Sequence, residues 1–149
     1  MSEDTREAIL NRLVEVGKDL AGIKTAKRNE LDIQESDRPA FVVLDADEST
    51  DDSSFNRGRP ARAPVIVGMT PECYLLIEEV DGANIGTTIN DYRRRLIKAV
   101  LTDASLVALC KDGDIRFEGF ATGLASGRSM EGEAGISFSF HYVLRPDKL

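Results

Sequence analysis

Hydrophobic residues recur at helical spacing in two long stretches of the chain. In residues 4–21 they form one face, and we expect Asp4 as the N-cap, Glu7 as its capping-box partner and Gly22 as a left-handed C-terminal cap. A second helix is predicted to begin at Thr87 or Thr88. Its core side carries Ile89, Tyr92, Leu96, Ala99 and Val100. A short third helix is predicted over residues 104–110, capped by Asp103.

Strict alternation of apolar and polar residues over 136–144 predicts a half-buried strand. Its apolar face carries Ile136, Phe138, Phe140, Tyr142 and Leu144, and its polar face carries Ser137, Ser139 and His141. We expect it to form a final hairpin with a strand over 115–122. Further strands are expected over residues 23–28, 40–44, 64–69 and 73–77.

The segment between Met69 and Cys73 permits two interpretations. It can be a turn, or it can belong to one long, bulged strand over residues 64–77. We favour the bulged strand, because Thr70–Glu72 is short and has no glycine.

The order of these elements predicts an α+β fold in one domain, residues 1–149. We expect a mostly antiparallel sheet with both long helices on one face. Two polar segments cannot fill a core and are expected to be long exposed loops. One runs from about 45 to 63, first acidic and then basic, and the other is the glycine-rich segment 123–135. Shorter turns are expected at 81–84 and 111–114.

Composition narrows the class of protein. Of 149 residues, 42% are hydrophobic and 30% charged, as in a globular domain, and no apolar run approaches the roughly 18 residues that span a bilayer. The polar N-terminus predicts no signal peptide. A net charge of −7 argues against a dedicated nucleic-acid-binding protein. Cys73 and Cys110 are expected to be reduced and buried, with a disulfide formed after release from the cell as the alternative.

The single histidine does not complete a catalytic group. His141 and Ser139 are neighbours on one face of a strand, about 7 Å apart at Cα, which is too far for a Ser–His pair. With one histidine and two distant cysteines, the chain lacks ordinary zinc-ligand spacing. We therefore expect neither an enzyme nor a cofactor.

Two other segments are poor matches to ligand-binding motifs. Residues 82–88 have glycines before a helix but lack the lysine of a phosphate-binding loop, and the two glycines are one residue too close. A turn followed by an N-cap is therefore favoured. The acidic residues do not follow the pattern of a calcium loop, which favours a solvated loop; they are Asp45, Asp47, Glu48, Asp51 and Asp52.

Charges of opposite sign lie in separate blocks of the sequence. This arrangement permits head-to-tail pairing between identical copies, although solvation of an exposed surface is the simpler interpretation. The candidate contacts to a neighbouring subunit or to another assembly partner are Asp45, Asp47, Asp51, Asp52, Arg57, Arg59, Arg62, Arg93, Arg94, Arg95, Arg128, Met130, Glu131 and Glu133.

The chain resembles the tail terminator (tail completion, or minor tail) proteins of tailed bacteriophages. The resemblance covers most of the chain and rests on the order of several stretches. These are the N-terminal helix followed by Gly22-Ile-Lys, then RPAFVVLDAD (38–47), GRPARAPVIV (58–67), MTPE (69–72), LIKAVLTD (96–103), GRSMEGE (127–133) and FSFHYVLRP (138–146).

The resemblance implies a structural virion protein in the tail or neck, assembled in the host cytoplasm. Such a subunit forms a homohexameric ring that caps the tail tube, stops its polymerisation and provides the docking surface for the head. Its implied partners are itself, the tail tube protein, neck or head-completion proteins and, in a contractile tail, the sheath protein. DNA only passes through the lumen, and no membrane is involved. The long loops, about 45–63 and 123–135, would be ordered by neighbouring subunits or the tube.

Two alternatives stay open at this point. The chain could form another head–tail joining or neck ring, which has a similar size and fold class. It could also be a small ligand-binding domain or enzyme that uses the segment 82–88 or His141.

Overall fold

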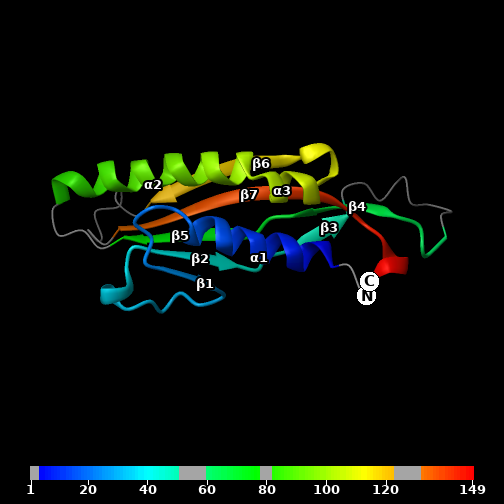
Figure 1. Ribbon diagram of the computed structural model, residues 1–149, viewed down its shortest axis with the longest axis horizontal. Coiled ribbons are helices and arrows are strands. Elements are labelled where there is room, and N and C mark those ends of the chain that lie inside the picture. Colours follow the sequence, from blue (N-terminus) through cyan, green and yellow to red (C-terminus); the bar gives the residue numbers. More distant parts are fainter. Residues whose placement is uncertain (1–3, 51–59, 78–81, 123–131) are drawn as a thin grey trace.

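The α+β architecture predicted from the sequence is confirmed (Figure 1). The computed structural model describes residues 4–50, 60–77, 82–122 and 132–149, and in them it has three α-helices and seven strands. The helices are α1 (Thr5–Lys18), α2 (Gly82–Thr102) and α3 (Ala104–Leu109). The strands are β1 (Thr25–Arg28), β2 (Ala40–Leu44), β3 (Glu48–Thr50), β4 (Val65–Met69), β5 (Glu72–Ile77), β6 (Ile115–Thr122) and β7 (Gly132–Leu144).

The longest strand, β7, connects the two halves of the sheet. β6 pairs with one edge of β7, and β4 and β5 lie end to end along its other edge. The register does not change between the pairs Met69–Phe140 and Glu72–Ser137. The shared register agrees with the long-strand interpretation, but the segment forms two separate strands and the expected bulge is absent from β4–β5. Pro71 has no N–H to donate, which explains why the strand is interrupted there.

β2 and β3 similarly follow one another along the outer edge of β5 and β4. β1 pairs in parallel with β2, and each of the other strand pairs in the described residues is antiparallel. The sheet is therefore mostly antiparallel, with β1 at one side and β6 at the other. A bulge near Glu118, between Phe117 and Gly119, is the irregular point of the β6–β7 pair.

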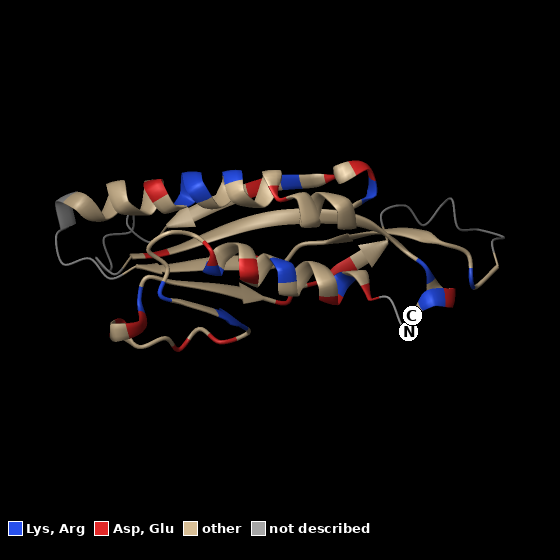
Figure 2. Cartoon of the chain, in the orientation of Figure 1, with Lys and Arg blue, Asp and Glu red and all other residues tan. Residues whose placement is uncertain are grey.

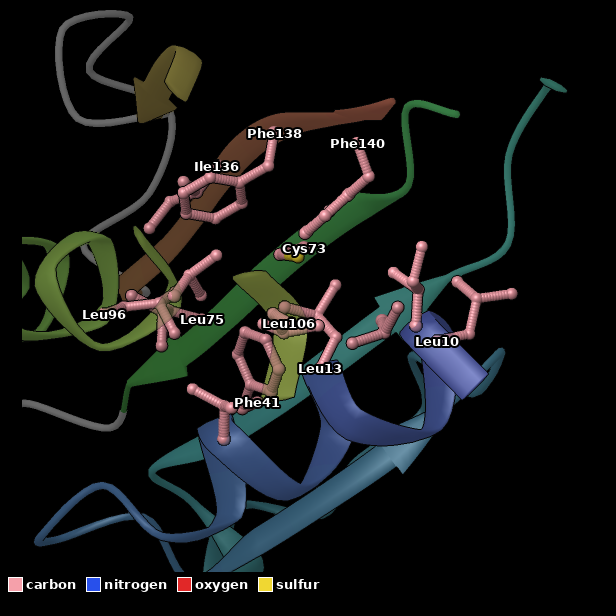
Figure 3. Close-up of a cluster of buried hydrophobic side chains, with 14 of the residues drawn as sticks. Leu10, Leu13, Phe41, Cys73, Leu75, Leu96, Leu106, Ile136, Phe138 and Phe140 are labelled. Atoms are coloured by element: carbon pink, nitrogen blue, oxygen red, sulfur yellow. The ribbon is translucent and has the colours of Figure 1, made fainter. Parts of the chain in front are cut away.

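The helices cover one face of this sheet, as expected. α1 packs on β1 and β2, whereas α2 packs on β5, β6 and β7. Figure 3 shows the core between these layers, where Leu13 of α1 and Leu96 of α2 lie near side chains from the strands. The alternation of β7 is confirmed, because Ile136, Phe138, Phe140 and Tyr142 are all at most 1% exposed.

A smaller apolar cluster lies on the opposite face of the sheet. Residues 29–39 bring Ile33 against Ala40, Val42 and Leu76, with Leu44 and Tyr74 at the margin. This cluster covers the β1–β2–β5 side of that face.

The N-caps predicted for α1 and α3 are correct, whereas the predicted end of the first helix and the N-cap predicted for the second helix are wrong. The Asp4 carboxylate accepts a hydrogen bond from the Glu7 N–H, and Asp103 accepts one from the Leu106 N–H. α1 ends at Lys18, with Asp19 as its C-cap. Gly22 does have a positive φ, +94°, but it lies in the turn before β1 and does not cap the helix.

Three other boundaries differ from the prediction. Glu48–Thr50 forms β3 inside the expected loop 45–63, because the free edge of β4 offers backbone partners. α2 begins at Gly82, before both Thr87 and Thr88, since buried Ile85 extends the apolar stripe by one turn. β7 begins at Gly132, so the last residues of the expected loop 123–135 belong to a strand. The turn expected at 81–84 is therefore helical from Gly82.

The described helices include none that is both long enough and apolar enough to span a membrane.

Candidate assembly surfaces

One of the acidic residues predicted to contact a neighbour, Asp45, is already paired with an arginine of the same chain. Arg28 makes paired bonds to Asp45, at 2.8 Å each, and bonds to both oxygens of Glu7 at 2.8 and 2.9 Å. The Arg28 guanidinium lowers the pKa of Asp45 and of Glu7 below their usual values. Arg28 of β1 therefore joins Glu7 of α1 to Asp45, which follows β2, and a role for Asp45 in binding a neighbour would compete with this pairing. Glu7, expected in a capping box, is instead held by Arg28 and Asn11.

The other candidates on the loops are placed as follows. Asp47 and Arg62 are exposed, and Glu133 is exposed on β7. The remaining candidates lie outside the described residues; they are Asp51, Asp52, Arg57, Arg59, Arg128, Met130 and Glu131.

The three consecutive arginines of α2 point in different directions, because each residue turns the helix by about 100°. Arg93 lies over the rings of Phe117 and Phe120, at 5.8 and 5.4 Å from their centroids. Arg95 stacks on Tyr92, donates to the Ala21 carbonyl and pairs with Asp91. These two side chains are engaged within the chain.

Arg94 is the arginine of this group that projects away from the sheet. Its side chain is 66% exposed, and Asp91, with which it forms an ion pair, is itself half exposed. Lys98, four residues later, is also exposed. Figure 2 shows Lys and Arg grouped along α2.

The different surroundings of Arg93 and Arg94 predict different mutational effects. Arg93→Ala should lower the free energy of unfolding by about 0.5–1 kcal/mol, because it exposes Phe117 and Phe120 and removes the cation–π contacts. Arg94→Ala should leave stability nearly unchanged, since an exposed ion pair contributes little. Urea unfolding of the two variants checks this. Equal effects would contradict the contacts assigned to Arg93.

No element of the described residues covers the second face of the sheet along β6, β7 and β4. Small residues lie on it: Gly135, Ser137 and Ser139 of β7, Gly119 and Ala121 of β6, and Gly68 of β4. Exposed carboxylates from three strands accompany them, namely Glu72, Glu118 and Glu133. We call this set of residues the uncovered face.

His141 stands at one end of the uncovered face, over Gly68. A Cβ at position 68 would lie 3.1 Å from His141 Nε2, which favours glycine there. His141 Nδ1 is buried without a hydrogen-bond partner in the described structure and lies 3.6 Å from Asp114 Oδ2. A surface pocket of about 470 Å³ adjoins it, lined by Ile66, Ile115, His141 and the turn 111–114 with Arg116. Asp114 is bound by Arg116 at 2.9 Å.

The segments considered for catalysis or ligand binding do not have the geometry that a Ser–His pair or a phosphate-binding loop requires. Ser139 Oγ donates to Glu118 Oε1 at 2.6 Å, so its hydroxyl is directed to a carboxylate rather than to His141. Residues 82–88 are helical and form no phosphate-binding loop. Within the described residues, no group of three or more His, Cys, Asp or Glu side chains could hold a metal ion.

Both cysteines are free and buried, as predicted. Burial raises the pKa of the Cys73 thiol, and burial together with Asp114 raises that of Cys110 to about 11. Neither thiol is suited to act as a nucleophile at neutral pH.

Glu72 and Glu118 were not among the contacts predicted from the sequence. Glu72 alternates with the apolar Cys73 and Leu75, and this pattern alone would have placed it on the polar face of β5. Glu118 gave no such indication, because the bulge in β6 breaks the alternation. No protein-family model matches the chain, and a comparison with curated proteins finds no match.

Proposed function

We propose that the chain is a structural virion subunit, a phage tail terminator that assembles as a homohexameric ring on the end of the tail tube. The observation that carries the proposal is that the two long polar segments join the sheet at opposite ends of β7. Residues 123–131 connect β6 to β7, near the pair Thr122–Ala134. Residues 51–59 lead from β3 toward β4, whose Val65 pairs with Leu144 at the other end.

This arrangement suits a ring that meets different partners on its two sides. One side of a terminator ring contacts the tail tube protein, and the other receives the neck or head-completion proteins. A subunit with one polar segment at each end of its sheet can contact both. The resemblance to tail terminators supports the same conclusion from the order of the sequence stretches.

A neck or head–tail joining ring is the nearest competing function. The two functions differ in the partner that the ring prefers. A terminator binds the end of a purified tail tube, whereas a neck ring binds portal or adaptor rings.

The experiment is a mass measurement in solution, followed by negative-stain imaging of the protein with purified tail tubes. We expect six copies per ring and a cap at one end of each tube. Because a ring can form on the tube alone, the sample with tubes decides the result. A chain that stays monomeric and never caps tubes would refute the proposal, and binding to portal rings in preference to tubes would favour the neck function.

A further inference from the structure

The uncovered face can receive another layer at close range. Ser137 is only partly exposed although no element of the described chain packs over it, Gly135 lies beside the ring of Tyr74, and Ser139 is 4% exposed beneath Glu118. Small residues on a strand allow another backbone to approach closely. The cluster around Ile33 ends at the β5 side and, within the described residues, does not extend over this part of the face.

The uncovered face is also acidic. Glu72 lies beside Ser137 in the neighbouring strand, and Glu118 on the other side accepts from Ser139. Two strand spacings, about 10 Å, therefore separate the strands that carry these two carboxylates. None of the described ion pairs includes Glu72, Glu118 or Glu133, whereas Arg116 on the same face is paired with Asp114.

The outer side of α2 has the opposite charge, and no helix or strand of the described part of the chain covers it. Arg94 and Lys98 project from it, one helical turn apart. Asp91 is the acidic residue beside them, and it also pairs with Arg95. The basic side therefore lies on the helix layer, and the acidic side lies on the opposite face of the sheet.

We propose that the outer side of α2 in one copy docks on the uncovered face of a second copy, with Arg94 and Lys98 against Glu72 and Glu118. The inference rests on the proposed ring, whose subunit contact it identifies. The two surfaces of one copy are different and lie on opposite faces, so the contact is head-to-tail. Repetition of such a contact closes a ring when the rotation between copies is suitable.

The test uses two complementary charge variants of the full chain. Arg94→Glu with Lys98→Glu makes α2 acidic, and Glu72→Lys with Glu118→Lys makes the uncovered face basic. Each variant alone brings like charges together, so we expect association to weaken at least about tenfold. An equimolar mixture should assemble like the wild-type protein, because every contact in an alternating ring then joins opposite charges.

A steric variant keeps the test independent of these charges. Ser137→Trp should prevent docking without unfolding the chain, because the side chain faces away from the core. Ser105→Trp, on the exposed side of α3, is the matched control and should assemble normally. Sedimentation velocity gives the masses, and thermal unfolding of each variant verifies that it is folded.

The outcomes separate this contact from the proposed function. One outcome would refute only the contact. If the charge variants and Ser137→Trp assemble as well as the wild-type protein, the proposed contact is wrong, but the proposed ring is not contradicted. If the mixture fails to recover assembly although both variants are folded, the charge pairing is wrong. If the wild-type protein stays monomeric at millimolar concentration and with tail tubes present, both the contact and the proposed ring are refuted.

Discussion

Replacing Gly17 by alanine is expected to lower the free energy of unfolding by about 1–3 kcal/mol, against the direction that helix propensity predicts. Gly17 is buried in α1, where the helix backbone lies directly on β2. A Cβ at this position would collide with the ring of Phe41. Phe41 is 0% exposed and surrounded by core side chains, so its ring has little room to move.

Gly86 provides the matched control, because it is also helical but its surroundings are open. A Cβ there would meet no atom within 4 Å. Gly86→Ala should therefore raise the free energy of unfolding by about 0.5–1 kcal/mol through helix propensity alone. Guanidinium unfolding of both variants measures the difference. Stabilisation by Gly17→Ala would mean that α1 and β2 are less tightly packed than the structure has them.

Replacing Asp103 by alanine is also expected to lower the free energy of unfolding substantially, because this side chain has two roles. It caps α3 through the Leu106 N–H, and it binds Arg12 of α1 at 2.7 and 3.0 Å. Loss of the cap alone should cost about 0.5–2 kcal/mol. Asp103→Asn keeps a capping oxygen but not the charge, so it should be less destabilising than Asp103→Ala. Urea unfolding at pH 7 checks the order, and equal losses would refute the capping role.

The effect of Asp103→Asn on the free energy of unfolding should also depend on pH. Arg12 lowers the pKa of Asp103 in the folded protein. The stability that the Arg12–Asp103 pair contributes is therefore present above the pKa of an unfolded aspartate, about 3.9, and is lost as the pH falls through the lower folded value. The stability difference between the wild-type protein and Asp103→Asn should shrink below that pH. A difference that stays constant from pH 7 to pH 2 would contradict the role of the charge.

Local patterns predicted the parts of the fold that depend on neighbours in the sequence. The alternation in β7 identified its buried aromatic face, and Asp4 and Asp103 were recognised as caps because capping involves a residue and the turn that follows it. The start of α2 was missed, since burial of Ile85 against the sheet outweighs the low helix propensity of its first residues. β3 was missed because its partner in β4 lies beyond the segment 51–59.

The candidate surfaces were less predictable, because they depend on which charges are already engaged. Arg93, Arg94 and Arg95 are indistinguishable as a sequence run, yet one covers aromatic rings, one projects from the helix and one is tied to the Ala21 carbonyl. Asp45 likewise looked available until the structure paired it with Arg28, a distant residue. Only the tertiary structure separates engaged charges from those available to a partner.

The position of β7 in the chain also affects how the protein is made. Among the described strands every other one precedes β7, yet β6 pairs only with β7, and β4 and β5 need it to complete their second edge. A nascent chain on the ribosome therefore has no complete sheet until residues 132–144 emerge. We expect a chain truncated before Gly132 to remain unfolded and to depend on chaperones. Since β7 also carries Ser137 and Ser139, such a chain could not present the proposed docking face.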